Sequence, residues 1–588
     1  MTNFIEESNY VTNHQAGFQK GISHLFQSFS LTQIIESTKE PVFVAFTDIN
    51  QAFDKVCRNI LWRHLFELGV RGKILHMLFD MYSSATYAIH FLNQVSECIR
   101  PSNGLRQGCT MSPLLFSLFI QILLNEIVAS NIGFKLGNIF CGCLAFADDI
   151  CLICQSASDL QKLLDICNNI AYKRLHLTFN ASESKTEVII FNIPPDHAAQ
   201  YSFKLGDLNI SIVSSYKHLG TRIKQNKSFA LQVQDRIQKA DSCFWSLVSK
   251  KVFYGLTFQQ ITTIYNSFVL PVMLANCAVY GPSLTKEQLQ QMTHTHFYHC
   301  RYLLGLNRVS CAHAAISGES GWFTIESYIA KFSLLLMGQI LTAKKDSLAK
   351  QIILYLFQEN IKTRWILGVT HLIEKFSLGP IIANLDNMEK WKANITEGII
   401  IAFKAMWSNE IRKPHSTLPM QFYSQVCTTF GPQVYLQQKF AKTRHFICAL
   451  KTNYVYSNAF LRVEPTCEPC NSPLNSMHIM LSCTKYSVER QIFQNDLISL
   501  LGRNLFEQYW TQPSRISLCQ SLLNFSFGPP ALRPKIIVFL LQFFESLMKV
   551  WIKLQKERKS LKKQAAKRRQ KRSRKRSVSN KPKKRSRH

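Results

Sequence analysis

The sequence has no apolar leader and no uninterrupted apolar run long enough to cross a bilayer. Residues 1–40 are polar and mixed, and the strongest candidate run, 536–552, is broken by Gln542, Glu545 and Lys549. We therefore expect no secretory signal and no membrane partner. The 18 cysteines are expected to be reduced, as small apolar residues or metal ligands, rather than paired in disulfides.

Acidic residues are also few, since 37 Asp and Glu stand against 69 Lys and Arg, a formal net charge of +32. Residues 556–588 hold 18 basic residues and one acidic residue, Glu557, which gives this tail +17 and leaves +15 on the first 555 residues. A basic body with a basic tail fits a polyanionic partner, because neutralising phosphates releases counterions. We expect a disordered basic tail at 556–588. Two functions stay open for it: a nuclear-import signal, or a non-specific RNA- or DNA-binding arm.

The hydrophobic pattern changes along the 588 residues, which exceed one compact core. Strand-like runs are 42–48, 141–147, 150–154, 187–192 and 203–212, and helical patterns begin at Asp54, Ser112 and Leu160. From Phe229 to about residue 450 the pattern is dominantly helical, and no internal repeat is visible. The sequence therefore predicts an α/β half followed by a mainly helical half.

Three aspartates stand at the ends of these strand-like runs. Asp48 ends the first run, and Asp148 and Asp149 occupy the tip of the predicted hairpin. Two divalent ions about 4 Å apart can catalyse the joining of a 3′ hydroxyl to a nucleotide. Carboxylates are suitable ligands for Mg²⁺, with Mn²⁺ as the alternative ion, so the three aspartates are candidate metal ligands. Each signal alone is weak, because an aspartate after a strand is usually a turn residue or a helix cap, and paired aspartates are common in hairpins.

Five sequence blocks give these aspartates a context. They are FTDINQAFDKV (46–56), NGLRQGCTMSPLLFSLFI (103–120), LAFADDICLI (144–153), and more weakly LTFNASESKTEVIIF (177–191) and YKHLG (216–220). In order and spacing they resemble successive motifs of the reverse transcriptases of non-LTR (LINE-type, jockey-like) retrotransposons. The resemblance is close over residues 15–225 and looser beyond.

The resemblance implies an α/β right-hand polymerase palm with partial fingers, followed by a mainly α-helical thumb and C-terminal region with a small zinc-binding module. The implied boundaries are 1–40 for the partial fingers, 41–225 for the palm, 226–450 for the thumb and connector, 451–490 for the zinc-binding module, 491–555 for a C-terminal helical region and 556–588 for the tail. The activity implied is RNA-directed DNA polymerisation, with an RNA template, a DNA primer or target and deoxynucleotides as partners. A ribonucleoprotein with the element RNA, a nuclear location and a cytoplasmic ribonucleoprotein stage are further expectations.

The resemblance also implies roles for single residues. Asp48 and Asp148 would bind both magnesium ions, Asp149 would be a weaker or more distant ligand, and Lys185 would donate a proton or contact phosphate as pyrophosphate leaves. Phe53 would lie beneath the sugar and exclude a ribose 2′ hydroxyl. The remaining implied contacts are Lys20, Arg106, Gln107 and Gly108 for the nucleotide and template, and Tyr216, Leu219 and Gly220 for the primer grip. Asp54 matches a family aspartate too, but its place at a predicted helix start favours an N-cap role.

The sequence departs from the family pattern near its start. In GFQKGISH (17–24), Gln19 and Ile22 replace two usual arginines, and Gln51 replaces a usual lysine. We find no upstream fingers segments and expect an N-terminally truncated chain without nuclease activity. These departures favour an alternative, a catalytically inactive nucleic-acid-binding remnant. An intron-encoded reverse transcriptase with splicing-helper activity would share the palm, but the FADD and RQGC blocks are closer to LINE-type elements.

A second cluster of chemistry-bearing residues lies near residue 470. Cys467, Cys470, His478 and Cys483 have the spacing C-x2-C-x7-H-x4-C and predict one structural Zn²⁺ site; the alternative is chance spacing in a cysteine-rich chain. Cys141, Cys143, Cys151 and Cys154 are also closely spaced. Because they fall in strands, whose side chains alternate between faces, we expect them to pack as apolar residues.

Overall fold

The computed structural model describes residues 10–180, 185–306, 311–343, 347–382, 387–415, 417–453 and 466–579. The chain forms two compact units. The first comprises residues 1–240, 271–292 and 325–402, and the second comprises 241–270, 293–324 and 403–588. The first unit therefore joins the predicted α/β half to later helical segments.

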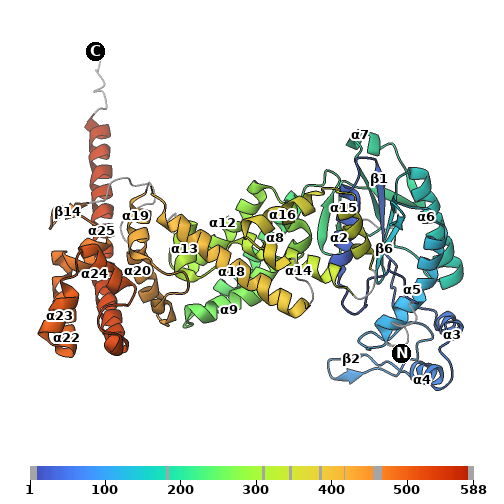
Figure 1. The fold of residues 1–588 in the computed structure, drawn as a ribbon, viewed down its shortest axis with the longest axis horizontal. Coiled ribbons are helices and arrows are strands. Elements are labelled where there is room, and N and C mark those ends of the chain that lie inside the picture. Colours follow the sequence, from blue (N-terminus) through green and yellow to red (C-terminus); the bar gives the residue numbers. More distant parts are fainter. Residues whose placement is uncertain are drawn as a thin grey trace, which may run out of the picture. The chain divides into compact units, whose positions relative to one another are not determined.

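The α/β half contains these elements, in chain order (Figure 1): α2 (His24–Glu36), β1 (Val42–Thr47), α3 (Arg58–Glu67), α4 (Lys73–Ser83), β2 (His90–Phe91), β3 (Gln94–Val95), α5 (Ser112–Ala129), β4 (Lys135–Leu136), β5 (Ile139–Phe140), β6 (Cys143–Phe146), β7 (Asp149–Cys154), α6 (Ala157–Ile170), η1 (Ala171–Leu175), β8 (Glu187–Phe191), α7 (Pro195–Ala198), β9 (Phe203–Leu205), β10 (Leu208–Ile212), β11 (Ser215–His218) and β12 (Thr221–Lys224).

The helical half continues as α8 (Ala230–Ser249), α9 (Phe258–Phe268), α10 (Leu270–Met273), α11 (Cys277–Tyr280), η2 (Gly281–Ser283), α12 (Lys286–Leu303), α13 (His313–Ser320), α14 (Ile325–Leu341), α15 (Leu348–Gln358), α16 (Arg364–Lys375), α17 (Gly379–Ile382), α18 (Met388–Arg412), α19 (Leu418–Val426), η3 (Val434–Gln437), α20 (Ala441–Lys451), β13 (Thr466–Cys467), β14 (Ser472–Pro473), α21 (Ser476–Leu481), η4 (Thr484–Tyr486), α22 (Ser487–Leu501), α23 (Arg503–Trp510), α24 (Arg515–Leu523), η5 (Pro530–Leu532) and α25 (Arg533–Ser579). The predicted change from an α/β half to a mainly helical half is confirmed.

A six-stranded sheet in the order β6-β7-β1-β8-β10-β9 forms the centre of the first unit. All six residues of β1 are buried, as its continuous apolar run predicts. Helices α5 and α6 cover one face of the sheet, and α2 with α15 covers the other (Figure 1). The sheet is therefore buried on both faces, which holds its central strands in a fixed register.

The cysteines of the β6–β7 region divide between the two faces of the sheet. Cys143 and Cys154 lie in the core under α5 and α6, and Cys141 and Cys151 lie in the core under α2 and α15. Burial raises the pKa of all four thiols. The prediction that they pack as apolar residues is confirmed.

Helix α5 corrects one expectation about apolar runs. It is long and apolar enough by composition to cross a membrane, and a bent pair of helices, 258–273 and 277–283, meets the same criteria together. Of the α5 segment, 61% is buried inside the protein. Its composition is therefore that of a helix packed on the sheet, and the predicted strongest run, 536–552, instead forms part of α25.

The tail is a second correction. Disorder was expected from residue 556, but α25 continues from Arg533 to Ser579. Its first turns are anchored by buried side chains such as Leu540 and Phe544. An anchored helix propagates readily through Lys, Arg, Gln and Ala, which have high helix propensity. The last nine residues of the sequence, 580–588, lie outside the described residues.

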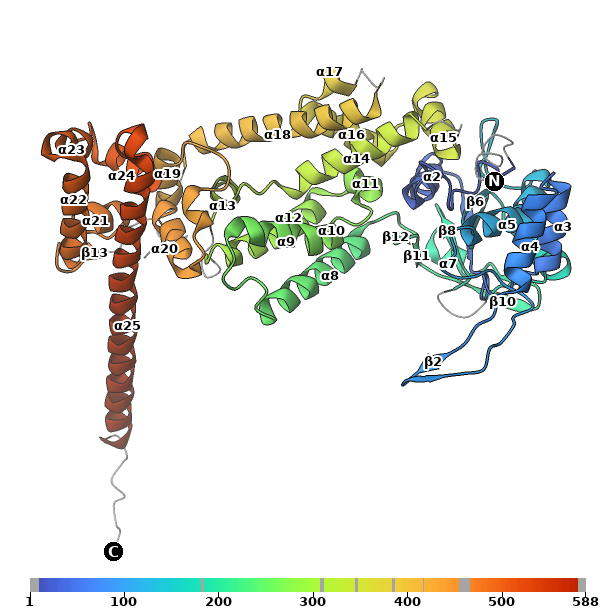
Figure 2. The same ribbon diagram turned by 90° about the horizontal axis from the view of Figure 1, so that it is seen from below.

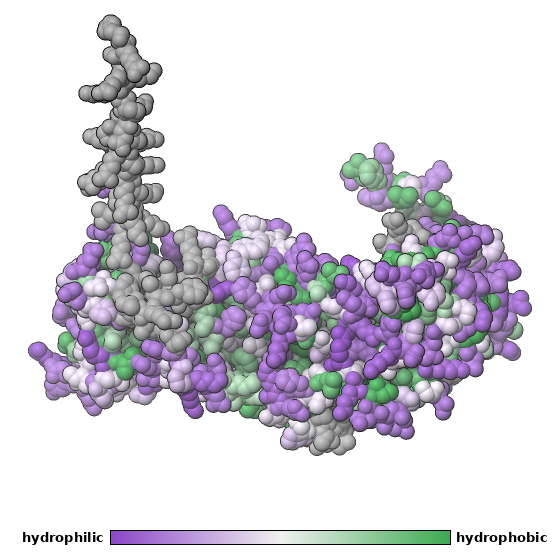
Figure 3. Space-filling view, turned by 90° about the horizontal axis from the view of Figure 1, so that it is seen from above, coloured by the Kyte–Doolittle hydropathy of each residue, from purple (hydrophilic) through white to green (hydrophobic). Residues whose placement is uncertain are grey.

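The β2–β3 hairpin extends away from the sheet of its unit, as Figure 2 shows. Apolar side chains crowd its end, where Phe91 is 69% and Leu92 81% exposed, and they form the apolar tip visible at the upper right of Figure 3. The predicted strand at 203–212 is also a hairpin, β9–β10, because Gly206 adopts a left-handed turn conformation (φ 62°).

Candidate active site

Strand pairing brings the three aspartates to one end of the sheet. Strands β1 and β7 are antiparallel, and Thr47 pairs with Ile150. The next residue beyond each member of this pair is an aspartate, Asp48 after Thr47 and Asp149 before Ile150. Adjacent strands lie about 4.8 Å apart, so Asp48 and the Asp148–Asp149 turn share one site. The main chain of Asp48 is held by Thr186, whose hydroxyl oxygen lies 3.3 Å from the Asp48 nitrogen.

The electrostatics of this site disfavour three negative charges without a cation. Burial, and then the charges of Asp148 and Asp48, raise the pKa of Asp149 to about 6. Burial and the charge of Asp48 also raise the pKa of Asp148, while Lys185 opposes both shifts. The Lys185 ammonium lies 3.4 Å from Oδ1 of Asp48. Partly buried oxygen ligands that repel one another fit a divalent ion such as Mg²⁺.

The turn between β6 and β7 is held by a residue that the sequence did not single out. Ala147 adopts a left-handed backbone conformation (φ 58°), which is strained for a residue with a Cβ. Gln15 is fully buried beside it: Oε1 accepts from the Ala147 nitrogen at 2.8 Å, and Nε2 donates to the Ala147 oxygen at 3.1 Å. The same Oε1 accepts from the nitrogen of Gly17, where a Cβ would lie 2.4 Å from the Ala147 nitrogen. The sequence signal that could have pointed to Gln15 was the nearby Gly17, the first residue of the block 17–24.

The residue predicted to lie beneath the sugar packs in an aromatic row. The ring of Phe53 stacks on Phe116, with centroids 4.6 Å apart, and meets the exposed Phe18 edge-on at 6.3 Å. The Phe53 oxygen also accepts from the Leu105 nitrogen at 2.8 Å. The ring thus packs on helix α5, and the main chain of Phe53 is held by the loop before that helix.

That loop carries three of the predicted nucleotide and template contacts. Arg106, Gln107 and Gly108 are exposed, and Gln107 lines an open cavity of about 420 Å³. Asp54 and Gln107 both line the cavity, and Nε2 of Gln107 donates to Oδ1 of Asp54 at 3.2 Å.

The predicted N-cap role of Asp54 is wrong. Helix α3 begins only at Arg58, and its N-cap is Cys57, which makes no side-chain cap. Gln51 has a left-handed conformation (φ 52°), and residues 51–55 form turns that delay the helix.

The predicted primer-grip residues form the β11–β12 hairpin. Tyr216 stacks on Phe46 of β1, with centroids 4.3 Å apart, and its hydroxyl donates to the Lys185 oxygen at 2.9 Å. Leu219 and Gly220 make the turn. The hydrogen bond from Tyr216 connects this hairpin to Lys185, and so to the aspartate site.

The predicted contact Lys20 is exposed ahead of α2, and the amide of the neighbouring Gln19 is turned toward the Gln15 oxygen. The part of the fourth motif at 181–184 lies outside the described residues.

Comparison with known proteins points to one family. Residues 1–223 match the family model described as reverse transcriptase (RNA-dependent DNA polymerase). Over 123 residues the chain is 31% identical to the Pol polyprotein of the type-2 retrotransposable element R2DM of Drosophila melanogaster, and 28% identical to that of the type-1 element R2 of Nasonia vitripennis. Over 303 residues it is 22% identical to the probable RNA-directed DNA polymerase from transposon X-element of Drosophila melanogaster. Residues 1–223 are therefore similar to reverse transcriptases, and the relatives that match come from the R2 and X retrotransposable elements.

The chain spans less than a third of the length of the retrotransposon relatives it matches. The R2 alignments cover 21% of this chain and 12% of each relative, and the X-element alignment covers 48% of this chain and 31% of the relative. Among solved structures, telomerase from Candida albicans in complex with a fragment of telomeric RNA matches 66% of this chain and 56% of its own, at 10% identity and a TM-score of 0.28. The jockey-like subtype stays a prediction.

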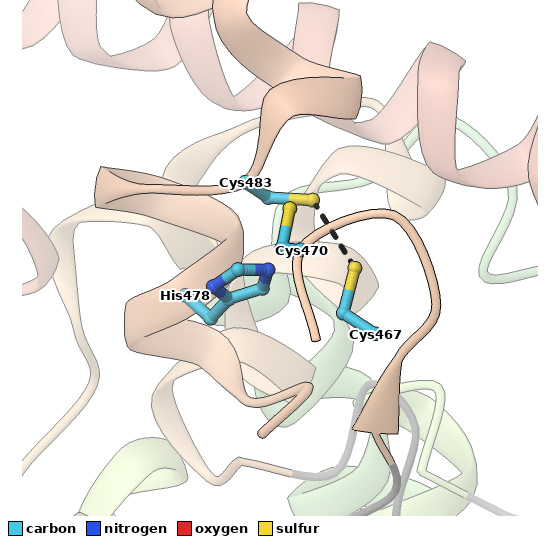
Figure 4. A group of neighbouring side chains, drawn as sticks. All are labelled: Cys467, Cys470, His478 and Cys483. Atoms are coloured by element: carbon cyan, nitrogen blue, oxygen red, sulfur yellow. Dashed lines mark hydrogen bonds between the residues drawn. The ribbon is translucent and has the colours of Figure 1, made fainter. Parts of the chain in front are cut away.

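Outside the matched residues 1–223, the predicted zinc ligands come together (Figure 4). The ligand atoms of Cys467, Cys470, His478 and Cys483 all lie within 4.8 Å of one another. Nδ1 of His478 lies 3.2 Å from the Ser472 hydroxyl, whereas its Nε2 is buried without a hydrogen-bond partner in the described part of the chain. A ring nitrogen left free while the other is oriented by a neighbour fits a metal ligand. Three sulfurs and one nitrogen suit tetrahedral Zn²⁺.

Proposed function

We propose that this chain is an RNA-directed DNA polymerase that extends the 3′ hydroxyl of a primer along an RNA template. The observation that carries the proposal is the register of β1 and β7, which puts Asp48 beside the Asp148–Asp149 turn. Two Mg²⁺ ions bound by these carboxylates would make the 3′ hydroxyl nucleophilic and neutralise the pyrophosphate. Asp48 and Asp148 would hold both ions, with Asp149 further away.

The surrounding residues support the remaining steps of such a reaction. Lys185, beside Asp48, would donate a proton or bind phosphate as pyrophosphate leaves. The ring of Phe53, fixed against Phe116, would exclude a ribose 2′ hydroxyl. Exposed Arg106, Gln107 and Gly108 would contact the nucleotide and template.

The same proposal gives the elements their roles. Residues 1–40 would be partial fingers, 41–225 the palm and 226–450 the thumb and connector. A structural Zn²⁺ would stabilise 451–490 next to the C-terminal helical region, and the basic end of α25 would bind RNA or DNA through phosphates or direct nuclear import. The partners would be RNA template, DNA primer or target and deoxynucleotides, in a ribonucleoprotein that acts in the nucleus.

Primer extension on an RNA template with Mg²⁺ tests the proposal. We expect Asp148→Ala to lower incorporation by at least about 10³-fold, since several kcal/mol of transition-state stabilisation would be lost. Asp207→Ala is the matched control, because Asp207 is exposed in the β9–β10 turn, away from these carboxylates in the sequence. Circular dichroism checks that both variants fold.

The outcomes separate the two candidate functions. Equal incorporation by the wild type and Asp148→Ala would refute the metal-dependent mechanism. No incorporation by any folded form would support the inactive nucleic-acid-binding remnant that Gln19, Ile22 and Gln51 favour.

A further inference from the structure

Asn276 lies between α10 and α11 and uses its whole side-chain amide to join segments far apart in the sequence. Its Nδ2 donates to the Leu219 oxygen at 2.8 Å and to the Thr221 hydroxyl oxygen at 2.9 Å. Its Oδ1 lies 3.0 Å from Nε2 of His24. The amide oxygen Oδ1 can only accept, so the His24 ring donates to it from Nε2.

The first two bonds hold a strained turn. Leu219, at the turn of β11–β12, has a left-handed backbone conformation (φ 45°), which costs on the order of 1–3 kcal/mol for such a residue. Gly220 follows with φ 80°, and a Cβ there would lie 3.1 Å from Nδ2 of Asn276. The amide therefore lies directly against the turn and fixes the carbonyl of its strained residue.

The third bond leads toward the aspartates. The ring of His24, the first residue of α2, packs edge-on against Phe146 with centroids 6.2 Å apart. Phe146 is the last residue of β6 and pairs with Asp149. Asn276 and His24 thus connect the turn of the β11–β12 hairpin to the Phe146–Asp149 pair that closes the turn of the β6–β7 hairpin.

We propose that Asn276 is a positioning residue that fixes the Leu219–Gly220 turn relative to the Asp148–Asp149 turn, and so places the primer 3′ end at the aspartates. The proposal rests on the polymerase function proposed above. Asparagine suits the position because it supplies two donors and one acceptor. An aspartate of the same size turns a negative oxygen toward the Leu219 carbonyl.

The test uses Asn276→Asp and Asn276→Ala in the full chain, with Asn360→Asp and Asn360→Ala as matched controls. Asn360 also has a left-handed conformation (φ 52°) and is exposed. Hydrogen exchange of the 215–224 hairpin is the first readout and needs no activity. We expect exchange there to be about tenfold faster in the Asn276 variants only, as losing about 1.4 kcal/mol of hydrogen bonding implies.

Primer extension supplies the second readout. We expect the KM for primer–template to rise about tenfold in Asn276→Asp, with the KM for deoxynucleotide unchanged, since only the primer end is displaced. Unchanged hydrogen exchange of the 215–224 hairpin in both Asn276 variants would show that Asn276 does not hold the turn. Faster exchange with an unchanged primer KM, or with both KM values raised alike, would overturn the positioning role. No extension by the wild type would instead defeat the polymerase function, and with it the primer role, while the exchange result would still decide whether Asn276 holds the turn.

Discussion

The ammonium of Lys185 lies 3.4 Å from Oδ1 of Asp48, the carboxylate expected to bind both metal ions. The Tyr216 hydroxyl, 2.9 Å from the Lys185 oxygen, holds the main chain behind that side chain. The lysine is therefore presented to the aspartate site from a fixed backbone, although its own side chain is half exposed.

We expect Lys185→Met to lower kcat by about 10²-fold, because a positioned proton donor is lost in the step that releases pyrophosphate. The measurement is single-nucleotide incorporation at saturating primer–template. Lys204→Met removes an exposed lysine from β9 and is the matched control. A kcat for Lys185→Met equal to that of the control would assign the lysine no chemical role.

The core of the site could be predicted because its signals are local. A continuous apolar run predicts the buried strand β1, and two shorter runs around Asp148–Asp149 predict the β6–β7 hairpin. Once both elements form one sheet, their ends coincide. The clustering of Cys467, Cys470, His478 and Cys483 was predictable for a similar reason, since all four lie within one short segment.

The residues that fasten the site could not be predicted in the same way. Gln15 contacts Ala147 across 132 positions, and His24 contacts Asn276 across 252. Single polar side chains carry no periodic pattern, so nothing in the sequence indicates their distant partners. The predicted N-cap role of Asp54 was wrong for a local reason. Gln51, with its left-handed backbone conformation, starts a turn where the start of a helix was expected.

Gln15 provides a test of how strongly the aspartate turn depends on its support. Methionine has a similar length and no hydrogen-bonding amide, so Gln15→Met leaves the buried nitrogen and oxygen of Ala147 without that partner. We expect the Mg²⁺ concentration for half-maximal activity to rise by at least about tenfold, because each buried group left unsatisfied costs about 1–3 kcal/mol of support for the turn.

Magnesium titrations of primer extension check this expectation. Gln94→Met, at an exposed position of β3, is the control for the substitution itself. If Gln15→Met folds and requires no more Mg²⁺ than the control, the Gln15 amide does not position the aspartates.

The Cys467–Cys483 cluster predicts a measurable metal content. Elemental analysis of the purified protein should find one zinc per chain, and Cys470→Ser should lose most of it, since a hydroxyl is a far poorer ligand than a thiolate. Cys98→Ser changes an exposed cysteine elsewhere and should keep the zinc.

Removing the metal should also loosen the fold around it. We expect faster hydrogen exchange over 466–486 in Cys470→Ser and in wild type treated with a zinc-selective chelator, because binding energy at such sites is folding energy. Equal zinc content in Cys470→Ser and Cys98→Ser would contradict the assignment of these ligands.

His296, in the second unit, predicts a loss of stability in acid. Its ring is fully buried, Nε2 donates to the Phe323 oxygen at 3.1 Å, and Nδ1 lies 3.1 Å from the Tyr265 hydroxyl. Burial, and next the nearby His299, lower the pKa of His296 to about 3 from its ordinary 6.5. Between these values the unfolded chain binds a proton that the folded chain does not, so stability falls as pH falls below 6.5. The resulting loss in the free energy of unfolding reaches about 2 kcal/mol at pH 5.

Urea unfolding at pH 7 and pH 5 should therefore show a smaller loss of stability in acid for His296→Gln than for the wild type. His76→Gln, at an exposed position of α4, should lose as much as the wild type. An equal loss in His296→Gln would mean that protonation of this ring does not drive the acid destabilisation.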